Sequence, residues 1–188
     1  AVKGSSQYRK LTFLPESIGE RVLPAGLHLQ ERPHIPGAMA SSPFDAEGVA
    51  TRDSDLVTDG VLQRYVLGSY SARKLGLRTT GNAGGSHNLI VRPGKRDLVG
   101  LAALMGRGLL VTEVLGQGVN YVTGDYSRGA AGFWVEGGRI AYPVHEITIA
   151  GNLRDMFKAI VAVGADAYTM GSKTLGSVLI ERMKVAGS

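Results

Sequence analysis

Apolar and polar residues alternate along much of the second half of the chain, as they do in half-buried β-strands. The alternation predicts strands near 109–115, 119–123, 130–136, 139–142 and 144–149, with a final strand in the segment SVLIERMKV. Earlier in the chain, Asp59 and Gly60 separate two short apolar runs. An Asp-Gly pair supplies the positive φ angles that a two-residue hairpin turn requires. We therefore expect hairpin strands near 54–58 and 61–67.

Two other segments have the spacing of apolar residues that is typical of a helix. Asp97 is a good N-cap for a helix at 97–106, and Leu98, Leu101, Ala102 and Met105 share one face of it. Asn152 begins a second helix at 153–163, which Gly164 ends. Its inner face is predicted to carry Met156, Phe157, Ile160 and Val161. Because strands and helices do not alternate regularly, the pattern favours an α+β, β-rich fold with two main helices over a doubly wound sheet.

The first 40 residues show no regular periodicity. Four prolines fall within LPESIGERVLPAGLHLQERPHIPG, and proline restricts the backbone of its own residue and of the residue before it. We expect an extended arm or linker at 1–40 and one β-rich domain at 41–188. The segment SYSARKLGL is expected to form at most a short helix, which Gly76 would end.

The stretch TGDYSRGAAGFWVEGGRI, residues 123–140, contains a strand with almost no side chains at 129–132. Such a strand allows another backbone to approach closely, either a neighbouring strand or an extended peptide that adds itself by main-chain hydrogen bonds. Gly137 and Gly138 are expected to turn this strand into the next. Arg128 and Asp125 are expected to form a local ion pair that holds a turn.

Composition places the chain among ordinary globular proteins. It has 188 residues with 27 glycines, 44% hydrophobic and 20% charged residues, and a mean hydropathy of +0.03. No apolar run approaches the roughly 20 residues that span a bilayer, so we expect no membrane interaction. Cysteine is absent, which removes disulfides and thiolate zinc ligands, and the expected location is the cytoplasm.

Positive charge is concentrated in the middle of the chain. The net charge is +5, and the segment 61–110 alone holds eight basic residues and one acidic residue, Asp97. The basic residues are Arg64, Arg73, Lys74, Arg78, Arg92, Lys95, Arg96 and Arg107. A solvated basic surface is the simplest interpretation, and a phosphate-binding or acidic-partner face is the alternative.

Catalytic motifs are incomplete. HEITI lacks the second histidine of a zinc-protease helix, so His145 has no partner, and His87 stands alone in GNAGGSHN. GDYSRG is displaced by one position from a nucleophile elbow, which argues against Ser127 as a nucleophile. SARK fits a Ser-x-x-Lys pattern through Ser71 and Lys74, but its companion motifs are missing. The sequence therefore assigns no catalytic residue and no metal ligand to this chain.

Longer strings resemble one protein family. SSPFDAEGVATR, SYSARKLGLRTTGNAGGSHN, the long segment VTEVLGQGVNYVTGDYSRGAAGFWVEGGRIAYPVHEITIAGNLRDMF and GSVLIERMKVAG are similar to the TldD/PmbA family, in its PmbA (TldE) branch. The match covers nearly all 188 residues in order and corresponds to the carboxy-terminal domain. Family members are about twice as long and have a further, amino-terminal domain.

The resemblance implies a curved, barrel-like and mostly antiparallel β structure. It also implies a cytoplasmic, two-subunit metalloprotease that trims or degrades unfolded peptides, in a family first described as a modulator of DNA gyrase. In that family the TldD-like subunit holds zinc on an amino-terminal helix and completes the site with a cysteine. That cysteine would fall near Met170 or Gly171 of this chain, and a thioether is too soft and uncharged to replace a thiolate on Zn²⁺. The segment 164–174 matches the family least.

The resulting hypothesis is a non-metal-binding subunit that has no cofactor of its own, with zinc expected in a TldD-like partner. Seven residues are candidates for lining the path of an unfolded peptide: Asp125, Tyr126, Ser127, Arg128, Gly129, Gly132 and His87. Two alternatives stay open: a basic module that binds nucleic acid or associates with DNA gyrase, and a serine hydrolase that uses Ser71 and Lys74. Nucleic acid is not the expected partner, and whether the chain associates with itself is left open.

Overall fold

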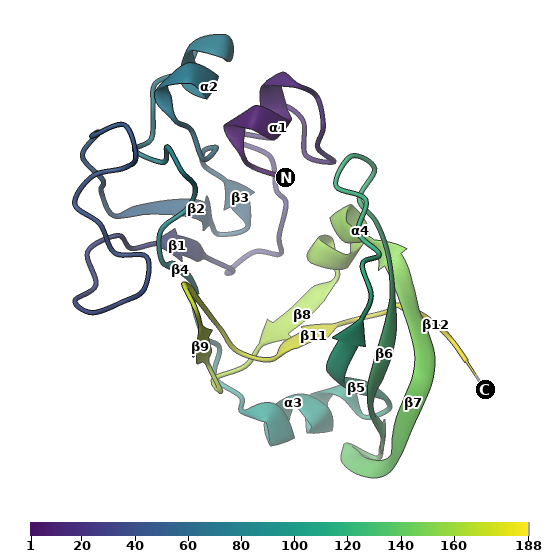
Figure 1. Ribbon diagram of the computed structural model, residues 1–188. Coiled ribbons are helices and arrows are strands. Elements are labelled where there is room, and N and C mark those ends of the chain that lie inside the picture. The colour runs from purple at the N-terminus through teal and green to yellow at the C-terminus, as the bar shows by residue number, and fades with distance from the viewer. Residues whose placement is uncertain (188) are drawn as a thin grey trace. The chain divides into compact units, whose positions relative to one another are not determined.

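The computed structural model describes residues 1–187 and divides them into two compact units (Figure 1). The first unit combines Ala1–Arg92 with Ala167–Leu175. The second unit combines Pro93–Asp166 with the chain from Gly176 onward. Each unit is thus built from two segments that are distant in the sequence.

A six-stranded sheet forms the centre of the first unit, in the order β3-β2-β1-β4-β10-β9. Its strands are β1 (Leu29–Glu31), β2 (Ser54–Thr58), β3 (Val61–Leu62), β4 (Leu89–Val91), β9 (Tyr168–Met170) and β10 (Lys173–Leu175). Neighbours are antiparallel except β4 and β10, which run parallel. Asp59 and Gly60 have φ angles of 50° and 76°, which confirms the predicted hairpin turn, although β3 ends at Leu62.

The amino-terminal segment belongs to the core of the first unit. Residues 1–40, expected as an extended arm, contain the helix α1 (Gly4–Tyr8) and the strand β1, and they bury Phe13, Leu14 and Val22. These side chains join a core that also includes Leu56, Val57, Leu62, Tyr65, Val66, Leu67 and Ala72. The prolines shape the backbone locally, but burial of the apolar side chains between them determines where the segment lies. The short helix α2 (Ser69–Lys74) contributes one of them, Ala72.

The second unit contains a four-stranded antiparallel sheet in the order β12-β7-β6-β5. Its strands are β5 (Gly108–Leu115), β6 (Asp125–Glu136), β7 (Arg139–Asn152) and β12 (Lys184–Ala186). Gly137 and Gly138, at φ angles of 56° and 75°, make the predicted turn between β6 and β7. The two strands expected at 139–142 and 144–149 form one strand, and residues 119–123 form a turn in which Val119 makes a single bridge to Tyr126.

Both predicted helices of the second unit begin at the expected caps. The Asp97 carboxylate accepts a hydrogen bond from the amide of Gly100 (2.8 Å) at the start of α3 (Leu98–Met105). The Asn152 side chain accepts from the amide of Arg154 (3.1 Å) at the start of α4 (Leu153–Lys158). Of the residues on the predicted inner faces, only Leu101 and Met156 are buried.

The prediction of a helix to residue 163 is wrong, because α4 ends at Lys158 and the strand β8 (Ile160–Val163) follows. Three of the four residues of β8 are β-branched, which lowers helix propensity and favours a pleated strand. The strand pairs with β11 (Val178–Ile180) in a two-stranded antiparallel sheet. Pairing with a distant segment thus overrides the helical spacing read from the sequence.

The α+β, strand-rich class is confirmed, and helices are confined to four short segments of residues 1–187. The curved, barrel-like sheet implied by the family resemblance takes the form of separate sheets of six, two and four strands, which are not closed into a barrel. None of the helices in the described part of the chain combines the length and apolar character needed to cross a membrane.

Candidate functional site

The glycine-rich candidate segment forms the first half of β6, which is an inner strand of the four-stranded sheet. It pairs with β5 on one side and with β7 on the other: Gly129 lies opposite Leu115 and Thr148, and Gly132 opposite Val111 and Val144. The backbone that comes close to these glycines therefore belongs to neighbouring strands of the same sheet. A peptide can reach this segment only across a face of the sheet, and not by adding itself beside β6.

Gly132 shows why a side chain is excluded here. A Cβ atom at this position would lie 1.9 Å from the carbonyl oxygen of Leu110, on the neighbouring strand. The strand pairing also shifts register between Val111 and Glu113, and between Ala130 and Gly132. Gly129 is less crowded, because the nearest atom to its Cβ position is the Leu115 Cβ at 3.4 Å. The two glycines thus differ in how strictly the sheet requires them.

The side chains of β6 divide between two faces of the sheet. Ala130 forms a buried cluster with Ile147 and Ile149 of β7, and Tyr126 packs against this cluster. Asp125 and Ser127 are exposed, and side chains alternate between faces along a strand. Asp125 and Ser127 therefore face away from Tyr126. Of the four polar candidates on β6, Asp125 and Ser127 are the two available on an open face.

Asp125 holds the turn that precedes β6. Its carboxylate accepts hydrogen bonds from the Thr123 hydroxyl (2.6 Å) and from the Asn152 amide (3.2 Å). These two hydrogen bonds hold the pKa of Asp125 below its ordinary value, and the bond from Thr123 has the larger effect. Asn152 also donates to the carbonyl of Thr123 (3.0 Å). Asp125 thus links the turn at residues 120–124 to the start of α4.

Arg128 does not pair with Asp125, and the prediction of that ion pair is wrong. Residues three apart on a strand point to opposite faces, so the two side chains diverge. The Arg128 guanidinium donates through Nη2 to the carbonyl oxygen of Gly116, while its Nε is buried without a hydrogen-bond partner among the described residues. Arg128 therefore holds the beginning of the loop 116–124.

The loop 116–124 lies directly on β6. The amide of Ser127 donates to the carbonyl of Gly118 (2.7 Å), and a Cβ on Gly118 would fall 1.4 Å from the Ser127 carbonyl oxygen. The loop exposes two large apolar side chains, Tyr121 at 63% and Val122 at 45%. The sequence did not indicate these two residues, because it predicts a strand at 119–123, whereas residues 121–123 form an exposed turn.

His87 belongs to the first unit, whereas the other six candidates belong to the second. Its imidazole lies between two carbonyl oxygens, with Nδ1 3.2 Å from that of Ala40 and Nε2 3.1 Å from that of Gly81. Its amide donates to the Glu31 carboxylate (2.7 Å). These contacts give His87 a role in fixing the loop 81–88 of the first unit.

Glu31 is the centre of a buried polar network that the sequence did not reveal. It is 1% exposed and accepts hydrogen bonds from Arg64, from the Asn82 amide (2.9 Å) and from the amide of His87. Arg64 also donates to the Asn82 side-chain oxygen (3.0 Å) and to the Ser54 hydroxyl (2.7 Å). These partners are 33 to 56 positions from Glu31 in the sequence, so no local sequence motif predicts the contacts.

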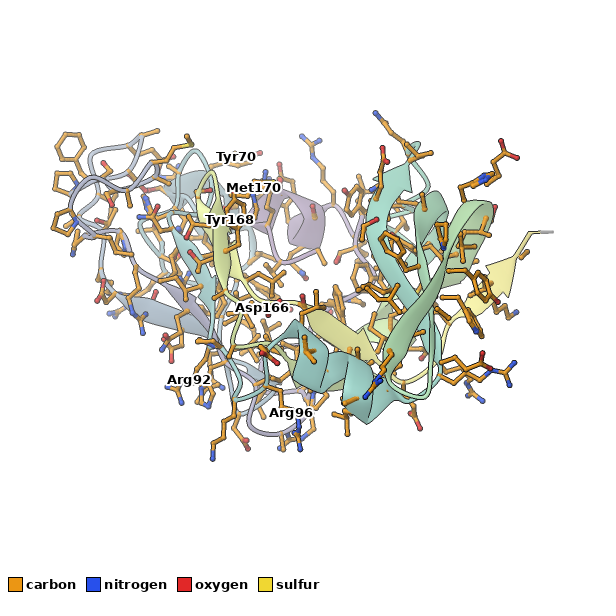
Figure 2. The ribbon with its side chains drawn as sticks, turned by 90° about the horizontal axis from the view of Figure 1, so that it is seen from below. Tyr70, Arg92, Arg96, Asp166, Tyr168 and Met170 are labelled. Atoms are coloured by element: carbon orange, nitrogen blue, oxygen red, sulfur yellow. The ribbon has the colours of Figure 1, made fainter. Side chains whose placement is uncertain are left out.

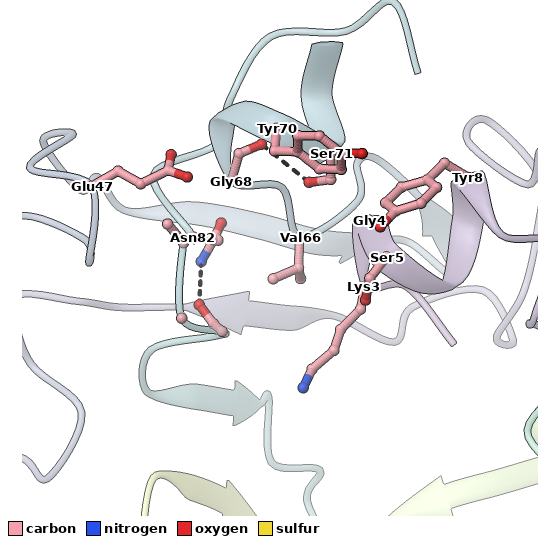
Figure 3. A pocket seen from close by; sticks show the side chains of 13 residues that line it. Lys3, Gly4, Ser5, Tyr8, Glu47, Val66, Gly68, Tyr70, Ser71 and Asn82 are labelled. Atoms are coloured by element: carbon pink, nitrogen blue, oxygen red, sulfur yellow. Dashed lines mark hydrogen bonds between the residues drawn. The ribbon is translucent and has the colours of Figure 1, made fainter. Parts of the chain in front are cut away.

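A cavity of about 320 Å³ lies beside this network in the first unit (Figure 3). It is lined by Lys3, Gly4, Ser5, Tyr8, Glu47, Val66, Gly68, Tyr70, Ser71, Asn82, Ala83, Gly84 and Gly85. The segments SARK and GNAGGSHN contribute to its walls, and the opposite wall comes from α1, within the segment for which the sequence predicts an extended arm.

The Ser71–Lys74 pair does not form a catalytic couple. The Ser71 hydroxyl donates to the carbonyl of Gly68 (3.1 Å), and the Lys74 ammonium lies over the Tyr70 ring, 5.7 Å from its centroid. No hydrogen bond joins the two side chains in the described structure. The geometry therefore gives no support to a serine hydrolase that uses these residues.

The described residues do not fit a zinc site. Within residues 1–187, no group of three or more His, Cys, Asp or Glu side chains is placed to hold a metal ion. Met170, near which the family's cysteine would fall, is 74% exposed on β9 together with Tyr168 (Figure 2). Gly171 has a φ angle of 59° in the turn that follows. We derive no chemical step through a metal held by this chain.

A comparison with protein-family models shows the family of the chain. A model described as the PmbA/TldA metallopeptidase C-terminal domain matches residues 1–187. The chain belongs to this family. It is 54% identical over its whole length to Metalloprotease PmbA of Escherichia coli O157:H7, of which it spans 42%. A Metalloprotease TldD homolog of Haemophilus influenzae is 24% identical over 86% of the chain and 36% of that relative. The chain therefore belongs to the PmbA branch.

The fold agrees with solved structures of the family. A crystal structure from Thermotoga maritima, described as a modulator of a DNA gyrase, superposes with a TM-score of 0.91 at 36% identity. The superposition covers 98% of this chain and 45% of the other. The chain thus spans less than half the length of these relatives, and it matches the domain that the family model describes as C-terminal.

Proposed function

We propose that this chain is the carboxy-terminal domain of a PmbA-like subunit that does not bind the catalytic metal. In this proposal it works with a TldD-like subunit, which carries the zinc, and the pair trims unfolded peptides in the cytoplasm. The observation that carries the proposal is the contrast between 54% identity to a PmbA protein and 24% identity to a TldD homolog.

The four-stranded sheet offers an unfolded peptide two kinds of contact. β5 is an edge strand, and an edge can bind an extended chain of any sequence through main-chain hydrogen bonds. The exposed face of β6, with Asp125 and Ser127, and the loop 116–124 lie next to it. In the proposal the peptide lies along this edge, and Arg128 acts as a positioning residue because it holds the loop.

A cleavage assay with both subunits tests the proposal. Full-length PmbA-like protein, the TldD-like subunit and an unfolded peptide are mixed, and the rate is compared with that of each subunit alone. We expect cleavage to require both subunits. The proposal fails if the TldD-like subunit alone cleaves the peptide as fast as the mixture does.

An Arg128→Gln variant tests the role of the loop. The exposed Arg139, at the start of β7, provides a matched control as Arg139→Gln. We expect Arg128→Gln to reduce the cleavage rate of the mixture several-fold, and Arg139→Gln to leave it unchanged. Equal rates for the two variants would remove the loop from the peptide path.

The structure gives no comparable support to a nucleic-acid module. The eight basic residues of 61–110 are divided between the two units, five in the first and three in the second. Arg64 lies in the buried network, and Lys74 and Arg107 lie over the rings of Tyr70 and Trp134. We therefore propose no second function for this segment.

A further inference from the structure

The cavity of the first unit has a rigid polar floor. Asn82, 4% exposed, receives hydrogen bonds from Arg64 (3.0 Å) and Thr80 (2.7 Å) and donates to Glu31 and to the carbonyl of Gly85 (3.1 Å). Every hydrogen-bonding group of its side chain is thus engaged. Asn82 offers nothing to a ligand itself, but it fixes the position of Gly84 and Gly85 in the wall.

The far wall carries two tyrosines that are held against each other. The rings of Tyr8 and Tyr70 meet edge to face, with centroids 5.8 Å apart, and both line the cavity. Arg9 lies over the Tyr8 ring at 5.6 Å and Lys74 over the Tyr70 ring at 5.7 Å. Such contacts fix the rings and leave positive charge at the rim.

The charges of the cavity favour an anion. Among the described lining residues Glu47 is the one carboxylate, and the hydroxyl and backbone amide of Ser69 bind it and hold its pKa below the ordinary value, so it keeps its negative charge. Lys3 also lines the cavity, and the described structure gives its ammonium no hydrogen bond or ion pair. Figure 3 shows Glu47 and Lys3 on opposite sides of Asn82 and Val66. Lys3, together with Arg9 and Lys74 on the two tyrosine rings, sets three positive charges against the one carboxylate, and this balance favours a negatively charged ligand.

Further donors without a described protein partner lie along the same walls. They are the amide of Gly84 and the hydroxyls of Ser5, Tyr8 and Tyr70. Gly85, at a φ angle of 132°, has nothing within 4 Å of its Cβ position, so the wall there is open backbone. The amide and carbonyl of Gly85 are both bonded to Asn82 (3.0 and 3.1 Å), so the Gly84 amide is left to bind the main chain of a ligand, while Val66 and the tyrosine rings can pack against an apolar side chain.

We propose that this cavity binds the carboxylate end of a short peptide, with the ammonium of Lys3 on the carboxylate. The volume lies at the low end for ligand sites, which suits one or two residues and excludes a folded partner. The inference deepens the proposed function and rests on it for the source of the peptide, which would be a substrate or a product of trimming. The binding itself needs neither the partner subunit nor cleavage.

Nuclear magnetic resonance titration tests this site directly. The whole chain is titrated with an N-acetylated tripeptide as the free acid, with the same peptide as its C-terminal amide, and with acetate. We expect the free acid to shift the amide signals of Gly68, Gly84 and Gly85 saturably, and the amide form to bind at least about tenfold more weakly, since a charge-assisted hydrogen bond is lost. Equal affinity for the acid and the amide would overturn the proposal.

The remaining arms separate the alternatives. Lys3→Gln should weaken binding of the free acid about tenfold, whereas Lys10→Gln, at an exposed lysine outside the cavity, should not. Acetate that binds as tightly as the peptide would indicate a simple anion site and would overturn the peptide assignment. The absence of saturable shifts at the three glycines would also overturn it. None of these titrations measures peptide cleavage. The cavity proposal can therefore be overturned while the two-subunit assay supports the proposed function, and the proposed function can be overturned while the cavity still binds the peptide.

Discussion

Glu31→Gln is the sharpest test of what holds the first unit together. The Glu31 carboxylate is buried and serves three donors: Arg64 on one oxygen, and the Asn82 side chain and the His87 amide on the other. Glutamine has nearly the same shape but only one acceptor oxygen. Whichever way its amide turns, the NH₂ group meets a donor, and the charge of Arg64 loses its counter-ion.

The expected loss of stability is large. The Arg64 side chain is 15% exposed and that of Glu31 2% exposed, so solvent cannot replace the lost partner well. Removing one member of a buried ion pair costs about 3–5 kcal/mol, and a typical domain has a net stability of about 5–15 kcal/mol. We expect Glu31→Gln to remove a substantial part of the stability of the first unit.

Urea unfolding followed by circular dichroism measures this loss. Glu20→Gln is a matched control, because the Glu20 side chain is exposed in the same unit. We expect an unchanged unfolding midpoint for the control and a much lower one for Glu31→Gln. A loss below about 1 kcal/mol, the size of one ordinary hydrogen bond, would refute the reasoning that this network is a major source of stability.

Two further predictions concern the second unit. Gly132→Ala should cost at least about 1–3 kcal/mol, because its Cβ would lie 1.9 Å from the Leu110 carbonyl oxygen; Gly129→Ala, with an ordinary 3.4 Å contact, should cost clearly less in the same urea titration. The hydroxyl and the amide of Ser177 donate to the Asp166 carboxylate and lower its pKa. The ionised carboxylate therefore stabilises the folded state fully at pH values above the ordinary carboxyl pKa, and this contribution is lost as the pH falls through the lowered pKa. Asp166→Asn should therefore reduce the difference between unfolding midpoints at pH 7 and pH 3, and an unchanged difference would contradict this assignment.

Local signals in the sequence were reliable where one or two residues determine the backbone. Asp59-Gly60 and Gly137-Gly138 make the turns they predict, and Asp97 and Asn152 cap the helices they announce. In each case the hydrogen bonds or φ angles concerned lie within a few residues of one another. These features could be read correctly because no distant segment competes for them.

Features that depend on distant partners could not be predicted in this way. The helix expected to reach residue 163 stops at Lys158, because β8 pairs with β11. Asp125 and Arg128 looked like an ion pair in the sequence, but the strand sends them to opposite faces. The peptide-path role of the β6 candidates and of His87 stays a prediction. The cavity of the first unit could not be predicted, because its walls come from α1 and from the loop 81–88, which are far apart in the sequence.

The return of the chain to the first unit at residues 167–175 also affects how the molecule can be made. During translation, β4 (Leu89–Val91) remains an open edge until β10 (Lys173–Leu175), far along the chain, has left the ribosome. Nascent chains are most prone to aggregation while such edges are exposed. A truncation after Asp166 would keep every peptide-path candidate and still lose two of the six strands of the first sheet. Dividing this molecule for study therefore requires a cut that follows its two units, rather than a single position along the gene.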